Sequence, residues 1–232
     1  VNTHTNIIQI EKNWQVIFED KTTSLELKAD HSALIMKQIW DFSQTVDIDD
    51  VKEILDRQIA CNMAIANEGI HNSYGANIGH VILNMDSDCV KTRAKAYAAA
   101  GSDARMNGCE LPVVINSGSG NQGITCCVPV VVYAKELNCT QKQLYRALVL
   151  SNLTAIYIKT GIGTLSAFCG AVSSGAAAGA GIAYLHNGTY KEIRHTIVNA
   201  LAILSGTICD GAKASCAAKI ASSVDAGIMG YY

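Results

Sequence analysis

The sequence of 232 residues has few charged residues, only two prolines and no strong excess of either charge. Charged residues make up 16% of the chain, against about a quarter in an ordinary soluble domain, which favours a large buried interior. Eighteen basic residues nearly balance twenty acidic ones, so net charge gives no reason to expect binding to nucleic acid or to an anionic membrane surface. The scarcity of proline leaves long stretches in which helices can run uninterrupted.

A secreted disulfide scaffold is also absent. The nine cysteines are an odd number without compact spacing, and no basic-then-apolar leader of the secretory type is present in these residues. Both observations favour a reducing, cytoplasmic compartment. The chain opens on Val1 inside a strand-like pattern and stops at Tyr231-Tyr232 after a helical one, so we expect it to be a piece of a longer protein.

One uncharged stretch, Thr160–Leu185, is long enough to cross a bilayer. Its composition argues against that, because it consists mostly of Gly, Ala and Ser, whereas insertion is driven by Leu, Ile, Phe and Val. We therefore expect no membrane span, and interpret the stretch as a buried central helix that packs closely through small residues.

The patterns predict a mainly α (α+β) fold with two parts. In residues 1–25, the runs Thr5–Ile10 and Trp14–Glu19 are joined by Glu11-Lys12-Asn13 and predict a β-hairpin. Because an isolated hairpin is barely stable, we expect it to belong to an α+β subdomain whose sheet is completed upstream.

Residues 26–232 predict a multi-helix, bundle-like core. Apolar residues recur there at three- and four-residue steps, and Asp47 or Asp49 can cap the second helix. Pro129 falls inside one stretch and predicts a kink or a late helix start. The helical stretches expected are Ser32–Phe42, Asp49–Glu68, Asp88–Ala100, Gly123–Leu137, Thr140–Lys159, Gly163–Leu185, Tyr190–Leu204 and Ala212–Gly227.

Three cysteines, Cys169, Cys209 and Cys216, lie in the least charged, most Gly/Ala/Ser-rich stretches. Three thiols in such a setting suggest a soft-metal site. Cys209 and Cys216 are seven residues apart, about 10 Å along a regular helix, so the first turn must unwind or the thiols must lean together. Burial as small apolar side chains is the alternative, and we assign it to the other six: Cys61, Cys89, Cys109, Cys126, Cys127 and Cys139.

Two further segments are candidates for binding a substrate. The Gly-rich run from Asn116 to Gly123 leads into an apolar helical stretch, and free N–H groups at a helix start bind anions. The run lacks the Lys-Ser/Thr ending of a phosphate-binding loop, so a carboxylate is the preferred guest, although a plain turn also fits.

Shortly before that run, Arg105 could grip a carboxylate in a bidentate manner, or pair with Asp103 at the surface. His4, near the start of the chain, is a further candidate for the substrate site as a base or ligand, although a lone histidine at a strand end is usually neither.

Read in order, several motifs resemble the L-cysteine desulfidase family, a relative of the iron–sulfur L-serine dehydratase α-subunits. The resemblance extends over essentially the whole chain, from His4-Thr5-Asn6 to the helix after Cys216. Its motifs are Ser102-Asp103-Ala104-Arg105-Met106, Asn116-Ser117-Gly118-Ser119-Gly120-Asn121-Gln122-Gly123-Ile124, Leu165-Ser166-Ala167-Phe168-Cys169, and Ile208-Cys209-Asp210-Gly211-Ala212 with Cys216.

This resemblance implies that Cys169, Cys209 and Cys216 hold a 4Fe-4S cluster with one open iron position. It also implies a substrate carboxylate bound by the N–H groups of Ser117, Gly118, Ser119 and Gly120, by the Asn121 side chain, and with Arg105 as a helper. The family has a Cys-Thr-Glu-Pro motif whose cysteine is thought to act as base. No such motif occurs here, so a missing N-terminal segment or a second chain would supply it.

The implied reaction is β-elimination from a small amino acid without pyridoxal phosphate: L-cysteine to pyruvate, ammonia and sulfide, or L-serine to pyruvate and ammonia. We expect this chain alone to have little activity. A non-catalytic iron–sulfur binding or sensing fragment is the alternative class. The oligomeric state stays open, a homo-oligomer included.

Overall fold

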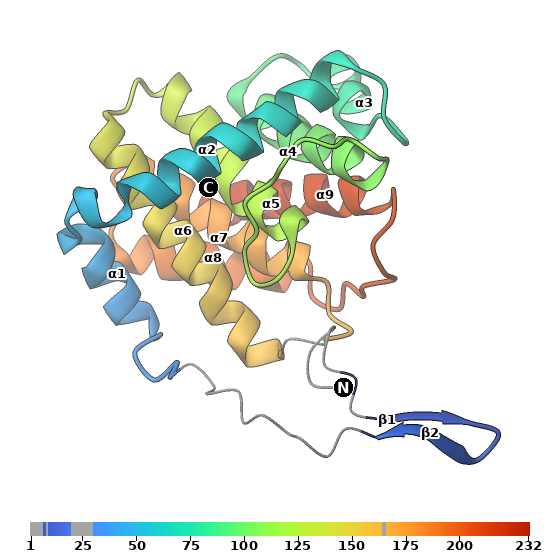
Figure 1. The fold of residues 1–232 in the computed structure, drawn as a ribbon. Helices are drawn as coiled ribbons and strands as arrows, with labels where there is room; N and C mark the ends of the chain where they lie inside the picture. The colour runs from blue at the N-terminus through green and yellow to red at the C-terminus, as the bar shows by residue number, and fades with distance from the viewer. Residues whose placement is uncertain (1–6, 8, 20–29, 164–165) are drawn as a thin grey trace.

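The computed structural model describes residue 7 and residues 9–19, 30–163 and 166–232. Within these ranges it has nine α-helices and one two-stranded antiparallel sheet (Figure 1), which confirms the mainly α prediction. The elements are β1 (Gln9–Lys12), β2 (Gln15–Glu19), α1 (Met36–Thr45), α2 (Ile48–His71), α3 (Ile78–Met85), α4 (Val90–Met106), α5 (Gly120–Glu136), α6 (Gln141–Ile162), α7 (Gly170–Leu185), α8 (Tyr190–Ile203) and α9 (Cys216–Tyr231).

The predicted hairpin is present, but its turn consists of Asn13 and Trp14, because Glu11 and Lys12, expected in the turn, belong to β1. Asn13 and Trp14 have φ values of 51° and 63°, and two positive φ values are typical of the tight turn whose twist matches that of the strands. Every residue of both strands is exposed, including Val16, Ile17 and Phe18. The upstream sheet and the division at residue 25 stay predictions, because residues 20–29 lie outside the described ranges.

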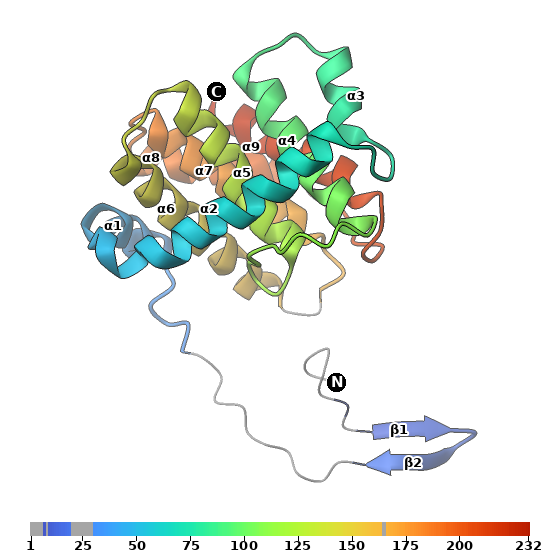
Figure 2. The ribbon, with the colours of Figure 1, turned by 45° about the horizontal axis from the view of Figure 1, so that its top comes forward.

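Helix α7 occupies the centre of the helical body. It packs against α5, α6, α8 and α9, while α2 runs diagonally across the front of the body in both ribbon views (Figures 1 and 2). Thirteen of the sixteen residues of α7 are buried, and most are Gly, Ala or Ser. This confirms a buried central helix for residues 170–185 of the uncharged stretch, whereas residues 160–162 end α6 and residues 166–169 form a loop. No helix in the described ranges is long and apolar enough to span a bilayer.

Helix starts show where long-range contacts decide the local structure. Asp47 caps α2 as predicted, its carboxylate accepting from the N–H of Asp49 at 3.2 Å. Helix α5 begins at Gly120 and continues through Pro129, so the late start was wrong. Helix α3 was not predicted, because it is short and follows the left-handed Asn77. Its first N–H, from Ile78, donates to the distant Asp103 at 2.6 Å.

Helices α7 and α9 begin later than predicted, at Gly170 and Cys216 rather than at Gly163 and Ala212. The backbone before α7 pairs with the backbone before α9 instead of continuing a helix. The Cys169 N–H donates to the Thr207 carbonyl at 3.1 Å, and the Cys209 N–H donates to the Ala167 carbonyl at 2.7 Å. Both segments are therefore held as loops at one end of the body.

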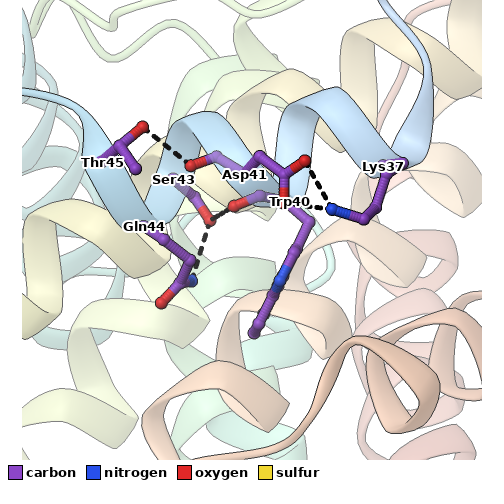
Figure 3. A network of polar contacts seen from close by, with 6 residues as sticks. All are labelled: Lys37, Trp40, Asp41, Ser43, Gln44 and Thr45. Carbon is purple, nitrogen blue, oxygen red and sulfur yellow. Dashed lines mark hydrogen bonds and ion pairs between the residues drawn. The ribbon is translucent and has the colours of Figure 1, made fainter.

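Helix α1 carries a network of polar contacts along its length (Figure 3). Lys37 pairs with Asp41, and Thr45 Oγ1 donates to the Asp41 carbonyl at 2.9 Å. The Trp40 ring packs against Tyr184 of α7 at 6.0 Å and Tyr190 of α8 at 6.1 Å between ring centroids. This network offers an ordinary surface ion pair as a control for the experiments below.

Candidate substrate and cysteine site

Backbone contact between α7 and α9 aligns the two helices that carry cysteines. A Cβ at Gly175 would lie 2.3 Å from the Ser223 carbonyl oxygen, and one at Gly179 would lie 2.4 Å from the Gly227 carbonyl oxygen. The later residue of α7 meets the later residue of α9, so the helices run parallel. Their N-terminal ends consequently lie together, with Cys169 capping α7 and Cys216 as the first residue of α9.

The third cysteine reaches the same place through the loops. Phe168 and Ile208 form an isolated antiparallel bridge. The bridge places Cys169 opposite Thr207 and Cys209 opposite Ala167, so the two cysteines are diagonal neighbours across it. Gly206 and Gly211 bracket Cys209 with φ values of 83° and 93°, which glycine adopts at little cost. The unwound turn expected between Cys209 and Cys216 is therefore present, because Cys209 lies in a loop and only Cys216 lies in the helix.

The three thiols differ in exposure. The Cys169 side chain is buried, Cys216 is half-buried and Cys209 is exposed. Burial raises the pKa of the Cys169 thiol, while the N–H of Ala171 and the nearby Lys219 ammonium lower it. The thiolate needed for metal binding is thus opposed by burial and supported by the α7 N-terminus and by Lys219.

Asp210 organises the loop between Cys209 and Cys216. Its carboxylate pairs with Lys219 of α9 and with Lys213 at 3.4 Å, and it accepts from the Ser215 hydroxyl at 3.4 Å. Lys219 also donates to the Ile208 carbonyl at 3.1 Å, and it lowers the pKa of Asp210 to about 2. One carboxylate and one ammonium therefore tie the cysteine loop to the first turn of α9.

The Gly-rich segment forms the opposite wall. Asn116 and Ser119 exchange backbone hydrogen bonds of 3.1 and 3.0 Å across Ser117 and Gly118, whose φ values of 49° and 81° are positive. This tight turn leads directly into α5, whose N-cap Ser119 makes no side-chain capping bond. The N–H groups of the first turn of α5 are therefore left for an anion.

Arg105 and Asp103 have separate roles. Arg105 Nη1 donates to Asn121 Oδ1 at 3.2 Å, and its guanidinium lies over Gly120, where a Cβ would be 2.3 Å from Nε. Asp103 is 1% exposed, accepts from the Ile78 N–H, and burial raises its pKa. Asp103 therefore supports α3 rather than pairing with Arg105 at the surface, and Arg105 belongs to the wall of the site.

The three cysteines, Arg105 and part of the Gly-rich segment line one cavity of about 430 Å³, here called the cysteine cavity. Three helices, α5, α7 and α9, begin at it, so three N-terminal ends with their positive partial charge lie around one space. Its lining residues are Arg105, Ser117, Gly118, Ser119, Asn121, Gln122, Lys159, Ser166, Phe168, Cys169, Gly170, Ala171, Cys209, Gly211, Ala212, Cys216 and Ile220.

Over residues 6–232 the sequence matches the family described as serine dehydratase alpha chain. The chain belongs to this family. Members of the same sequence group, named UPF0597 proteins, come from Desulfitobacterium hafniense (58% identical over 230 residues, 98% of this chain and 54% of that protein) and Finegoldia magna (52% over 232 residues, 100% and 55%).

A UPF0597 protein of Lachnoclostridium phytofermentans is 55% identical over 230 residues, 99% of this chain and 55% of that protein. The chain thus spans about half the length of the curated relatives it matches. No solved structure matches it significantly.

In this serine dehydratase alpha chain family member, most of the residues expected at the substrate site line the cavity. Gly120 starts α5 but does not line it, and His4 lies outside the described residues. Gln122 and Lys159 line the cavity and were not assigned from the sequence. Gln122 lies in the Gly-rich run from Asn116 to Gly123, so the motif could have indicated it as a residue of the site. Lys159 lies in the last turn of α6, where nothing in the sequence pattern indicates a binding residue.

The soft-metal donors that line the cavity are three cysteine thiols, the side chains that hold iron–sulfur clusters. No group of three or more His, Cys, Asp and Glu side chains within the described ranges is arranged to hold a single metal ion. In an iron–sulfur cluster each thiolate binds a different iron atom, so the ligands stand further apart. Cys169, Cys209 and Cys216 line the same cavity, and their residue type is the one such a cluster takes. Of the other six cysteines, Cys126 and Cys127 are buried as expected, whereas Cys89 is exposed.

Proposed function

We propose that the chain forms the substrate- and cluster-binding part of an iron–sulfur-dependent lyase that eliminates the β-substituent of L-cysteine or of L-serine. The observation that supports this most directly is that Cys169, Cys209 and Cys216 share one cavity with Arg105 and the start of α5. Soft-metal ligands and anion-binding groups thus face a volume that accommodates a small amino acid.

The chain's own groups would bind and orient the substrate. The first-turn N–H groups of α5 and the guanidinium of Arg105 hold the carboxylate. Asn121 fixes Arg105 by accepting its hydrogen bond. The substrate's β-carbon then points toward the three thiol-bearing positions. A 4Fe-4S cluster held by Cys169, Cys209 and Cys216 would supply Lewis-acid assistance to departure of the β-substituent.

Elimination also requires a base for the α-proton. We propose that this base comes from another segment or chain, as in the Cys-Thr-Glu-Pro motif of the family that the sequence resembles. We therefore expect the chain alone to bind substrate but to release little pyruvate. Adding the part of the Desulfitobacterium hafniense relative that the chain does not span should raise the rate.

The proposal also concerns which amino acid is the substrate. The motifs resemble the L-cysteine desulfidase family, whereas the family matched is described as serine dehydratase alpha chain. Departure of sulfide and departure of hydroxide place negative charge at the same position of the cavity, so both are compatible with its lining. We favour L-cysteine, with L-serine as the alternative.

The test is anaerobic reconstitution with iron and sulfide, followed by measurement of pyruvate from each substrate in the complemented protein. A brown protein that releases pyruvate, with sulfide from cysteine or without it from serine, would support the lyase and name the substrate. A brown protein that turns over neither would support the binding or sensing alternative. Colourless protein would contradict both.

Replacing Asp210 by Asn should weaken iron retention with little loss of stability. The substitution removes the carboxylate that joins Lys219, Lys213 and Ser215. Loss of a group that orients metal ligands typically costs about tenfold or more in metal affinity. We expect that loss in competition with an iron chelator.

Asp41→Asn is the matched control, because Asp41 forms an exposed ion pair on α1 (Figure 3). Exposed pairs contribute about 0–1 kcal/mol, so both variants should melt close to the wild type. Equal iron retention in the two variants would show that Asp210 has no positioning role.

A further inference from the structure

Gln122 is a buried amide in the cavity wall with no hydrogen-bond partner. Its side chain is 7% exposed, lines the cysteine cavity, and has an Oε1 atom that is fully buried and unpartnered. A buried amide without partners costs free energy. In the described structure, Gln122 therefore has an amide oxygen at the wall of the site that makes no hydrogen bond.

The position of this amide is fixed by its neighbours. Gln122 lies in the first turn of α5, next to Asn121. Its amide abuts Gly170 at the start of α7, where a Cβ would lie 2.6 Å from both Cδ and Nε2. The absence of a side chain at Gly170 thus leaves the space that the amide fills, one residue from Cys169.

Among the described residues, the cavity is lined by cationic and N–H donors but by no carboxylate. Arg105, Lys159 and the first-turn N–H groups can all donate, whereas no Asp or Glu is among the described residues that line it. An α-amino acid also brings an ammonium group, which needs acceptors. Asn121 Oδ1 already accepts from Arg105, so Gln122 carries the remaining side-chain amide.

We infer that the Gln122 amide oxygen accepts a hydrogen bond from the substrate's α-ammonium group, and so selects amino acids over the corresponding acids without the amino group. This inference rests on the proposed function. Turning the amide toward the ligand sacrifices no existing hydrogen bond, because neither of its ends makes one with a described residue. Gln122 is then a specificity-determining residue.

Binding to the reconstituted chain tests this without turnover. Calorimetry compares L-serine with 3-hydroxypropionate, which is serine without its ammonium group. The wild type should prefer L-serine, and Gln122→Met should lose about tenfold in affinity for L-serine with little change for 3-hydroxypropionate. Gln122→Glu keeps the acceptor and should retain the preference. Gln38→Leu, at an exposed position of α1, is the control and should match the wild type.

The outcomes separate this inference from the proposed function. Unchanged L-serine preference in Gln122→Met would overturn the role of Gln122 and leave the lyase proposal standing. Equal loss for both ligands, in Gln122→Glu as well, would overturn it in favour of an amide that donates to the carboxylate. Cluster-loaded wild type that binds neither ligand would instead contradict the proposed function.

Discussion

Replacing Cys209 by Ala is expected to abolish cluster binding while leaving the fold intact. Cys209 is exposed and lies in a loop, so truncating its side chain should change the free energy of unfolding by no more than about 0.5 kcal/mol. Its thiol is, however, one of three that line the cavity. Without it, the iron bound per chain and the broad visible absorption should fall to background after reconstitution.

Cys89→Ala provides the matched control for this experiment. Cys89 is also an exposed free cysteine, but it caps α4 and does not line the cavity. Its variant should retain wild-type iron, absorption and pyruvate release. If Cys209→Ala kept the wild-type iron content and spectrum, the assignment of Cys209 as a ligand would be wrong, and the lyase proposal would lose its main support.

Replacing Gly179 by Ala is expected to destabilise the whole body. The added Cβ would lie 2.4 Å from the Gly227 carbonyl oxygen, which is backbone and cannot swing aside as a flexible side chain can. Overpacking of this kind costs about 1–3 kcal/mol, and we expect the upper end. At about 2–4 °C per kcal/mol for a chain of this size, Tm should fall by roughly 6–12 °C.

Gly161→Ala is the control, because Gly161 also lies in a helix but a Cβ there meets nothing within 4 Å. That substitution should leave stability unchanged or raise it by about 0.4–1 kcal/mol. Urea unfolding followed by circular dichroism measures both variants. A Gly179→Ala variant as stable as Gly161→Ala would contradict the close contact of α7 and α9.

The local sequence contains most of the information about the helices. The periodic run in α2 and its Asp47 cap predicted that helix, and the small residues of α7 predicted a buried centre. What the sequence did not predict depends on contacts between distant residues. Helix α3 is capped by Asp103 from another helix, and the start of α7 is set by pairing with Thr207.

For the candidate site too, the sequence predicted the residues that local motifs mark but not the contacts between distant segments. The motifs indicated the cysteines and the Gly-rich segment, but their meeting requires the parallel packing of α7 on α9, which spacing alone does not reveal. Within the Gly-rich segment, the sequence favoured Gly120 although Gln122 lines the cavity. Successive positions on a helix point about 100° apart, so which of them faces the cavity depends on how α5 is rotated in the body.

The close backbone contact between α7 and α9 determines how far the two helices are shifted along each other. A sliding error of one helical turn would shift Cys169 by about 5.4 Å against Cys216. It would also take Gly179 away from Gly227, so the close backbone contact between the two helices at that point would be lost. The contacts of Gly175 with Ser223 and of Gly179 with Gly227 therefore fix the position of Cys169 relative to Cys216 through the backbone of the protein itself.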